Sequence, residues 1–417
     1  MKKTKKKIKK QVKKIKSRIV SIILVICFIV GIMGGWPKIQ QFVGDFLNPS
    51  QDPDVPPIVF SDKDLSFHFM MLGNENAGDS TYIKAGDVDI LIDAGSRVNS
   101  VSYISSYINN YVTDGKLEYV IVTHSDQDHI EGFVATNKQQ SIFDLYECKT
   151  IIDFNLTNKK LTTDLGNPTL YAKYLASRDA EIANGATHYT ALDCSKNQNG
   201  AQRIFQLAEG ITMEILYNYY YDHKATDEND YSVCVLFRHG SKAFLFTGDL
   251  EASGEAHLVD PESKNNLPEV ELYKAGHHGS PTSSNDCLLS IIKPKISVAC
   301  CCAGSVEYTD NLENTFPSQA FINRIAPYTD KVYVPIYIDI MDNPEYKPGS
   351  SKMKYKNSGE YKQLNGNIVV LSPADTRDDE DNIIISEVTV MGSNNSTKLK
   401  DTDWFKANRQ TPTAWQN

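Results

Sequence analysis

Apolar and polar residues along the middle of the chain form patterns that predict a layered α/β domain. The stretch 97–112 has apolar residues at helical spacing and predicts a helix. The stretch 81–95 predicts two strands that turn around Gly86. Further strands are predicted at 65–72, 116–124, 210–221, 231–251, 270–280 and 295–304. Strands joined by helices and hairpins are typical of a domain built in layers.

One of these strands is followed at once by four side chains that can bind a metal. The apolar run 119–122 ends, and the next seven residues include His124, Asp126, Asp128 and His129. Loops at the carboxyl ends of strands are where α/β sheets usually present ligands. Without a cation, carboxylates and imidazoles packed this densely would repel one another and desolvate poorly. The spacing therefore predicts a metal site, whereas the isolated histidines elsewhere are interpreted as structural or surface residues.

The first 36 residues differ in composition from the rest of the chain. Residues 1–18 hold 11 Lys and Arg and no acid; the whole chain is at −9, which leaves about −20 for the remainder. Residues 19–36 are uncharged, and at ~1.5 Å per residue they span ~27 Å, enough for a bilayer core. We expect a retained transmembrane helix there; a cleaved signal peptide is the alternative. The basic tail is then cytoplasmic, in contact with anionic lipids, and the later residues lie outside the cell membrane.

Three segments follow the predicted single membrane helix. Residues 37–60 are rich in proline and predict a stiff linker. Residues 61–374 form the predicted folded domain. Residues 375–417 begin with an acidic hinge and continue as an aromatic tail that docks either onto the domain or onto a partner protein, through Trp404, Phe405 and Trp415.

The cysteines predict no disulfide framework. Of eight cysteines, Cys27 lies in the predicted membrane helix, which leaves an odd number outside it. Residues 300–302 are three consecutive cysteines in a predicted buried strand, where neighbours point to opposite faces and do not pair readily. We expect neither disulfides nor a zinc cluster from this run.

Five ordered motifs resemble the metallo-β-lactamase superfamily. The sequence THSDQDH is similar to its H-x-H-x-D-H signature with Asp126 in place of the second His, a variant typical of the soluble domain of ComEC-like competence proteins. Sequences similar to other motifs of that group occur at residues 71–95, 229–251, 273–280 and 361–370. The resemblance covers about residues 66–370 and implies an αββα sandwich of the metallo-β-lactamase type, here behind an N-terminal transmembrane helix.

The resemblance also implies a metal-dependent hydrolase that uses one or two divalent ions, zinc or manganese. It implies that one ion is held by Asp128, His129, Asp249 and either His277 or His278. A second ion would share Asp249 and be held by His124 and Asp126. Two such ions can activate a water and clamp a phosphate. The expected catalytic residues are Asp128, Lys274, His277 and His278.

Several residues of these motifs have two interpretations each. Asp93 is expected to orient a ligand histidine from behind. Asp79 either caps the hairpin or supports a ligand, and Lys274 is either a surface lysine or a phosphate contact. Whichever of the paired histidines is not a ligand protonates a leaving group or binds phosphate. Ser280 contacts a phosphate oxygen or caps the turn.

Two departures from the family pattern bear on the site. The third imidazole that many relatives use has no clear counterpart, and Asn229 and His223 are the candidates for its place. Ser232 follows Asn229 in the same motif and is expected to support the site. The family's late G-H-P element has Phe316 where the His would stand, so any role of that His is lost or supplied elsewhere.

These features favour a membrane-anchored hydrolase that cleaves phosphoesters outside the cell. The substrate is either DNA, as the resemblance implies, or a small or cell-surface phosphoester. A domain near −20 lacks an evident basic track for a nucleic-acid backbone, which favours a phosphodiesterase over a processive DNA binder. β-Lactam hydrolysis is not expected from this motif variant. The alternative from another class is a catalytically weak, anchored binding module.

Overall fold

The computed structural model describes residues 60–416 except 310, 343–354, 379 and 381–382. The predicted basic tail and membrane helix lie outside the described residues, as does the linker except for Phe60. None of the helices in the described part combines the length and apolar character needed to cross a bilayer. The anchor at 19–36 therefore stays a prediction.

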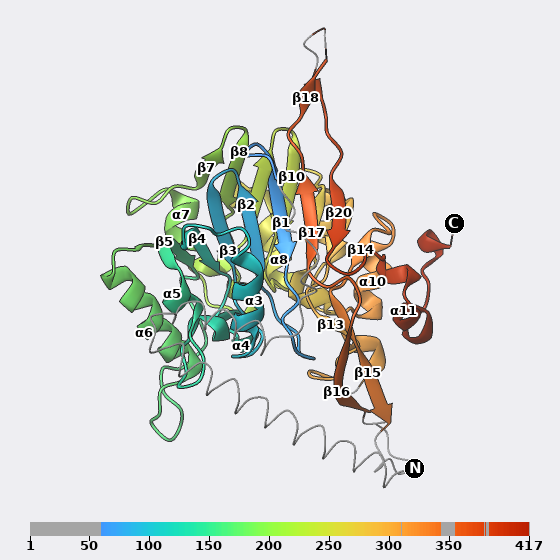
Figure 1. The fold of residues 1–417 in the computed structure, drawn as a ribbon, viewed down its shortest axis with the longest axis horizontal. Helices are drawn as coiled ribbons and strands as arrows, with labels where there is room; N and C mark the ends of the chain where they lie inside the picture. Colours follow the sequence, from blue (N-terminus) through green and yellow to red (C-terminus); the bar gives the residue numbers. More distant parts are fainter. Residues whose placement is uncertain (1–59, 310, 343–354, 379, 381–382, 417) are drawn as a thin grey trace, which may run out of the picture. The chain divides into compact units, whose positions relative to one another are not determined.

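The larger of two main sheets has eight strands in the order β20-β17-β1-β2-β3-β4-β5-β6 (Figure 1). Its strands β3 to β6 are parallel to one another, and the others pair antiparallel. The bounds are β1 Leu65–Phe69, β2 Thr81–Ala85, β3 Val88–Ile92, β4 Lys116–Val122, β5 Glu147–Asp153, β6 Thr187–Thr190, β17 Ile368–Ser372 and β20 Thr389–Gly392.

The second sheet has seven strands in the order β14-β12-β11-β10-β9-β8-β7. Strands β10, β11, β12 and β14 are parallel. The bounds are β7 Ile204–Ala208, β8 Ile211–Ile215, β9 Val235–His239, β10 Lys242–Phe246, β11 Leu272–Lys274, β12 Ile296–Val298 and β14 Val332–Tyr333. A three-stranded sheet and a hairpin complete the β structure, with β13 Cys302–Ala303, β15 Ile336–Asp342, β16 Tyr355–Gln363, β18 Thr376–Arg377 and β19 Ile383–Ile384.

The helices are short, apart from α6. Two of them begin with a capping box in which a hydroxyl and an aspartate satisfy each other's backbone N–H groups: Ser141 with Asp144 at α5, and Thr190 with Asp193 at α7. The bounds are α3 Ser100–Ile108, α4 Gln127–Ile130, α5 Ile142–Leu145, α6 Leu170–Ala183, α7 Ala191–Lys196, α8 Ala252–Val259, α9 Asp286–Ile292, α10 Gln319–Ile325 and α11 Asp403–Asn408.

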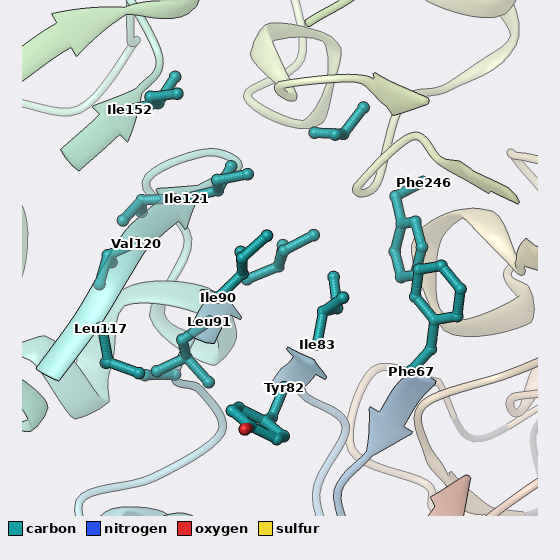
Figure 2. Packing of buried hydrophobic residues seen from close by; sticks show 14 of the residues in the cluster. Phe67, Tyr82, Ile83, Ile90, Leu91, Leu117, Val120, Ile121, Ile152 and Phe246 are labelled. Atoms are coloured by element: carbon teal, nitrogen blue, oxygen red, sulfur yellow. The ribbon is translucent and has the colours of Figure 1, made fainter. Parts of the chain in front are cut away.

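The two main sheets pack face to face. Alternate strand residues point to opposite faces, and Phe67 of β1 contacts Phe244 and Phe246 of β10 at ring-centroid distances of 4.8 and 5.5 Å. Figure 2 shows Phe67 and Phe246 against each other, with Ile83, Ile90 and Ile121 in the same core. The large aromatic and branched side chains thus bury the inner faces of both sheets together.

Helices cover the outer face of each sheet. His68, the neighbour of Phe67, points the other way, and its Nδ1 lies 2.8 Å from the hydroxyl of Tyr107 on α3. On the second sheet, Leu245 points outward into a core with Leu258 of α8 and Leu289 of α9. The layers are therefore helix, sheet, sheet, helix, as the resemblance implied.

Several strand predictions were too long, including 270–280, of which only Leu272–Lys274 is a strand. The predicted strand 210–221 ends at Ile215, and a 3₁₀ turn at Tyr219–Tyr221 follows it. The predicted strand 295–304 divides into β12 and β13, with Cys300 and Cys301 between them. All three consecutive cysteines are buried, and all seven cysteines in the described residues are free thiols, as expected.

The C-terminal segment packs onto the domain. Strand β20 pairs with β17 at the edge of the larger sheet. Trp404, Phe405 and Trp415 are buried in the core of the second sheet's outer layer. Arg409 lies over Trp404 and donates hydrogen bonds to the carbonyl oxygens of Thr315 and Pro317. The aromatic tail thus contacts the turn that contains Phe316.

Candidate metal centre

The expected site residues converge at the carboxyl ends of parallel strands from both sheets. Asp93 follows β3, and residues 123–129 follow β4. Asp249 follows β10 after a two-residue turn, and Lys274 ends β11 three residues before His277. Parallel strands end at the same edge of their sheet, so two sheets packed face to face bring these segments together between them.

Four buried side chains form a group that could hold a metal ion: Asp79, His129, Asp249 and His278. The Nε2 atoms of His129 and His278 each lie 3.1 Å from Oδ2 of Asp249. Oδ1 of Asp79 is 3.5 Å from Nδ1 of His278. Two imidazoles and two carboxylates at this spacing are a donor set that suits zinc or manganese.

Residues behind the two imidazoles aim their Nε2 atoms into the group. Nδ1 of His129 lies 2.8 Å from Oδ2 of Asp93, which also accepts from the hydroxyl of Thr123. Nδ1 of His278 lies 2.9 Å from the carbonyl oxygen of Cys300. Hydrogen bonds of this kind fix the tautomer and ring orientation of metal-binding histidines.

Two atoms of the group lack a hydrogen-bond partner within the described part of the chain. Nε2 of His278 and Oδ1 of Asp79 are fully buried, and neither makes a hydrogen bond of acceptable geometry. Leaving a buried polar atom unpaired costs free energy. A divalent cation would satisfy both atoms at once, so the side chains present fit a metal ion.

The charges of the group are strongly coupled. Burial opposes protonation of His129, but Asp249 and Asp93 outweigh it and raise the pKa of this imidazole well above its usual value. Asp249 and Asp79 do the same to the pKa of His278. When no metal is bound, both imidazoles are therefore in their protonated, cationic form. A cation that binds here must displace those protons, so its affinity falls as the pH is lowered.

Lys274 is a buried part of this group and not the surface lysine that was one interpretation. Its ammonium forms an ion pair with Asp79, lies 3.2 Å from Oδ1 of Asp249 and donates to the carbonyl oxygen of Gly248. It is 3% exposed, so it is held among carboxylates and does not face solvent where a substrate would enter. The geometry favours a positioning and charge-balancing residue over the phosphate contact expected from the sequence.

We expect Lys274→Met to destabilise the metal-free protein strongly. Removing one partner of a buried ion pair costs about 3–5 kcal/mol. Burial disfavours the Asp79 carboxylate, but Lys274, His278 and His129 outweigh burial and lower its pKa to about 2. The wild type therefore has this stabilisation above about pH 4 and loses it as the pH falls toward 2, whereas the variant lacks it throughout.

Denaturant unfolding with chelator, and again with Mn²⁺, measures the effect of Lys274→Met. Added metal should restore part of the lost stability, because a cation replaces the missing positive charge. Lys293→Met is the matched control: its pair with Glu269 is exposed at the surface, so its loss should leave the stability nearly unchanged. A metal-free Lys274→Met protein as stable as the wild type would show that the ammonium does not balance these carboxylates.

The residues expected to hold a second ion lie beside the group. His124 is buried, its Nδ1 lies 3.1 Å from the hydroxyl oxygen of Thr123, and its Nε2 is 3.6 Å from Asp126. Asp126 forms an ion pair with Lys159. Asp128, which was expected to hold the first ion, lies outside the four-residue group, with its Oδ2 3.3 Å from Nε2 of His278.

The structure distinguishes the two adjacent histidines. His278 is fully buried inside the group, whereas the His277 side chain is 21% exposed and its Nε2 lies 4.0 Å from Asp249. Nδ1 of His277 lies 3.3 Å from Glu251, which also accepts from the hydroxyl of Thr282. Both histidines have left-handed backbone angles, with φ of 46° and 55°, so a tight turn sends their rings in different directions.

The supporting residues from the sequence lie around this turn. Asn229 approaches both Glu251 and His277 through its side-chain nitrogen. The hydroxyl of Ser232 accepts from the backbone N–H of Asp249 and so fixes that residue's position. The hydroxyl of Ser280 lies 2.9 Å from that of Thr282 and accepts a hydrogen bond from the backbone N–H of Thr282. These contacts agree with the interpretation that Ser280 caps the turn.

His223 does not supply the missing imidazole. Its ring stacks on Tyr219 at 3.8 Å between centroids, and its Nδ1 contacts the side chain of Asp222 and a backbone carbonyl.

Sequence reasoning missed three neighbours of the site. Tyr308 is 54% exposed and donates a hydrogen bond of 2.8 Å to Asp128. Glu251 orients His277. It lies two residues after Asp249 and was not singled out from the sequence. Lys159 comes from a loop without periodicity and gave no signal. The ring of Phe316 lies within 6.0 Å of both His277 and His278, in the place where its motif suggested a lost histidine.

Comparison with known proteins agrees with the motifs. The chain is 26% identical over 255 residues to the competence protein ComA of Neisseria gonorrhoeae, a match that covers 61% of this chain and 29% of ComA. The chain resembles the metallo-β-lactamase domain of ComEC-like competence proteins. It is also 32% identical over 71 residues to recombination protein 2 of Haemophilus influenzae, covering 17% of this chain and 8% of that protein. The chain thus spans less than a third of the length of these two relatives.

No family model matches the chain. Among solved structures, the metallo-β-lactamase fold protein YhfI of Bacillus subtilis is 15% identical with a TM-score of 0.27, covering 50% of this chain and 70% of that one. The diiron β-hydroxylase CmlA of Streptomyces venezuelae is 12% identical with a TM-score of 0.31, covering 66% of this chain and 45% of that one.

Proposed function

We propose that this protein is a metal-dependent hydrolase that cleaves phosphodiester bonds. The observation that supports the proposal most directly is the buried group of Asp79, His129, Asp249 and His278, two of whose atoms lack partners. When bound, a divalent cation supplies a water of lowered pKa and polarises a phosphoryl oxygen. Similarity to competence proteins supports nucleic acid or a related phosphodiester as the substrate.

The chain's own residues would orient the reactants and move protons. Asp128 lies next to His278 and accepts from Tyr308, so its carboxylate is held at the edge of the group, where it can position a water. His277 reaches solvent and is oriented by Glu251. We assign His277 the role of proton donor to the leaving alkoxide, and His278 the role of ligand.

The substrate is a phosphodiester of DNA or a small or cell-surface phosphodiester. The net charge of about −20 outside the basic tail supports a compact substrate held mainly by the site, because long nucleic acids need many basic contacts. We propose further that residues 19–36 anchor the chain in the cell membrane as a single span. Residues 1–18 then lie in the cytoplasm and the hydrolase domain outside the cell.

The proposal is tested with full-length protein in detergent micelles, loaded with Mn²⁺ or Zn²⁺. We expect hydrolysis of bis-(p-nitrophenyl) phosphate that stops when a chelator removes the metal. A panel of linear DNA, RNA, nucleotide diesters and phosphorylcholine esters then ranks the substrates. Protein that holds metal but hydrolyses none of these would be the anchored binding module and not the enzyme.

A further inference from the structure

Lys159 occupies the side of the site where a second metal ion was expected. Its ammonium forms an ion pair with Oδ1 of Asp126, while Oδ2 of the same carboxylate lies 3.6 Å from Nε2 of His124. The Asp126 side chain is 28% exposed and that of Lys159 is 40% exposed, so the lysine borders both the site and solvent. A positive charge is thus already paired with one of the two residues expected to hold the second cation, while Nε2 of the other, His124, is buried without a hydrogen-bond partner among the described residues.

The loop that contains Lys159 is fixed by a buried carboxylate. Glu228 accepts hydrogen bonds of 2.7 Å from both the hydroxyl of Thr157 and the backbone N–H of Asn158. It also accepts from the hydroxyl of Ser125, the residue between His124 and Asp126. One side chain therefore ties the Lys159 loop to the loop of the expected second site.

Further hydrogen bonds attach Asn158, and with it Lys159, to the loop that contains Ala225 and Tyr231. The side-chain amide of Asn158 donates to the carbonyl oxygen of Ala225 and accepts from the hydroxyl of Tyr231. The backbone N–H of Lys159 donates to the hydroxyl of Thr157. The ammonium is thus directed at Asp126 by a backbone that is held on both sides.

The first metal group is complete without His124 or Asp126. The four side chains that converge within 4.8 Å come from Asp79, His129, Asp249 and His278. A second divalent cation would have to displace the ammonium or share Asp126 with it, and like charges at such distances repel. Two positive charges near a phosphodiester stabilise the negative charge that develops during cleavage. One of these charges can be a metal ion and the other a lysine.

We propose that the Lys159 ammonium takes the place of the second metal ion, so that each chain binds one divalent ion. The lysine supplies the second positive charge and contacts the non-bridging phosphate oxygen of the substrate. The phosphate contact rests on the proposed function; the binding of a single ion does not.

Metal counting tests this inference without an activity assay. Full-length protein is stripped with chelator, dialysed against Mn²⁺ and analysed for bound metal and for its electron paramagnetic resonance spectrum. We expect one ion per chain and a mononuclear spectrum for the wild type. Lys159→Met should bind two ions and show the spectrum of a spin-coupled pair. Lys160→Met is the matched control, because Lys160 is exposed and its pair with Asp164 lies at the surface; it should bind one ion.

Two ions in the wild type, or a single ion in Lys159→Met, would overturn the inference. The phosphate contact is measured separately, as the KM for an anionic diester at saturating metal. It should rise at least 10-fold in Lys159→Met and stay unchanged in Lys160→Met; an unchanged KM in Lys159→Met would refute the contact. If the ion counts are as expected but the wild type hydrolyses no phosphodiester, the proposed function fails while the single-ion inference stands.

Discussion

Replacing His129 by alanine will remove metal binding and hydrolysis together. His129 is fully buried, and its ring bridges Asp93 and Asp249, with Nδ1 2.8 Å from the first and Nε2 3.1 Å from the second. Changes to residues that only support a metal ligand typically cost 10–100-fold in affinity. Loss of the imidazole itself should therefore weaken Mn²⁺ binding by more than about 100-fold, and turnover should fall below detection.

Equilibrium dialysis with metal analysis measures the first effect, and bis-(p-nitrophenyl) phosphate turnover measures the second. The matched control is His223→Ala, which removes a histidine of the same protein that stacks on Tyr219 away from the group. That variant should keep wild-type metal content and activity. Wild-type metal content in His129→Ala would refute the assignment of this imidazole to the metal group.

Gly95→Ala will disrupt the site although Gly95 has no side chain to contribute. A Cβ at this position would lie 1.5 Å from the carbonyl oxygen of Asp128 and 2.6 Å from the backbone nitrogen of His129. The backbone at Gly95 cannot shift easily to relieve this clash, because its N–H donates a hydrogen bond to the carbonyl oxygen of Asp79. The segment 128–129 must therefore move, and a displacement of about 1 Å can cost about 100-fold in activity.

We expect Gly95→Ala to lose at least that factor in metal-dependent turnover and to bind Mn²⁺ more weakly. Gly115→Ala is the control for the loss of a glycine, because a Cβ there meets no atom within 4 Å. The left-handed φ of +75° at Gly115 should cost about 1–2 kcal/mol of stability without any change at the site. Equal turnover in Gly95→Ala and wild type would mean that the loop 128–129 does not need its observed position.

Much of the fold and part of the site follow from where apolar runs end. The run 119–122 marks the end of β4, and the residues after it lie at the sheet edge where Asp93 and Asp249 also lie. The ends of β3 and β4 lie together because these strands are parallel neighbours in one sheet. The place of Asp249 beside them was implied by the family resemblance, since β10 belongs to the other sheet. The helix-sheet-sheet-helix layers came from the resemblance, since alternation within strands does not say which sheet faces which.

The rest depends on loops whose shapes no periodicity records. Asp79 was expected to cap a hairpin or support a ligand, but it lies within the metal group. Its backbone N–H donates to the carbonyl oxygen of Asp128, and this long-range bond brings the two segments together. Lys159 lies 33 residues after its partner Asp126, and Tyr308 lies 180 residues after its partner Asp128, so tertiary structure alone brings each of them to the site.

The most direct measurement is anomalous X-ray diffraction at the manganese edge from crystals soaked in Mn²⁺. We expect an anomalous peak enclosed by Asp79, His129, Asp249 and His278, with the Nε2 atoms of both histidines facing it. A peak elsewhere, or soaked crystals in which these four side chains surround no metal, would contradict the proposal that they form the metal centre.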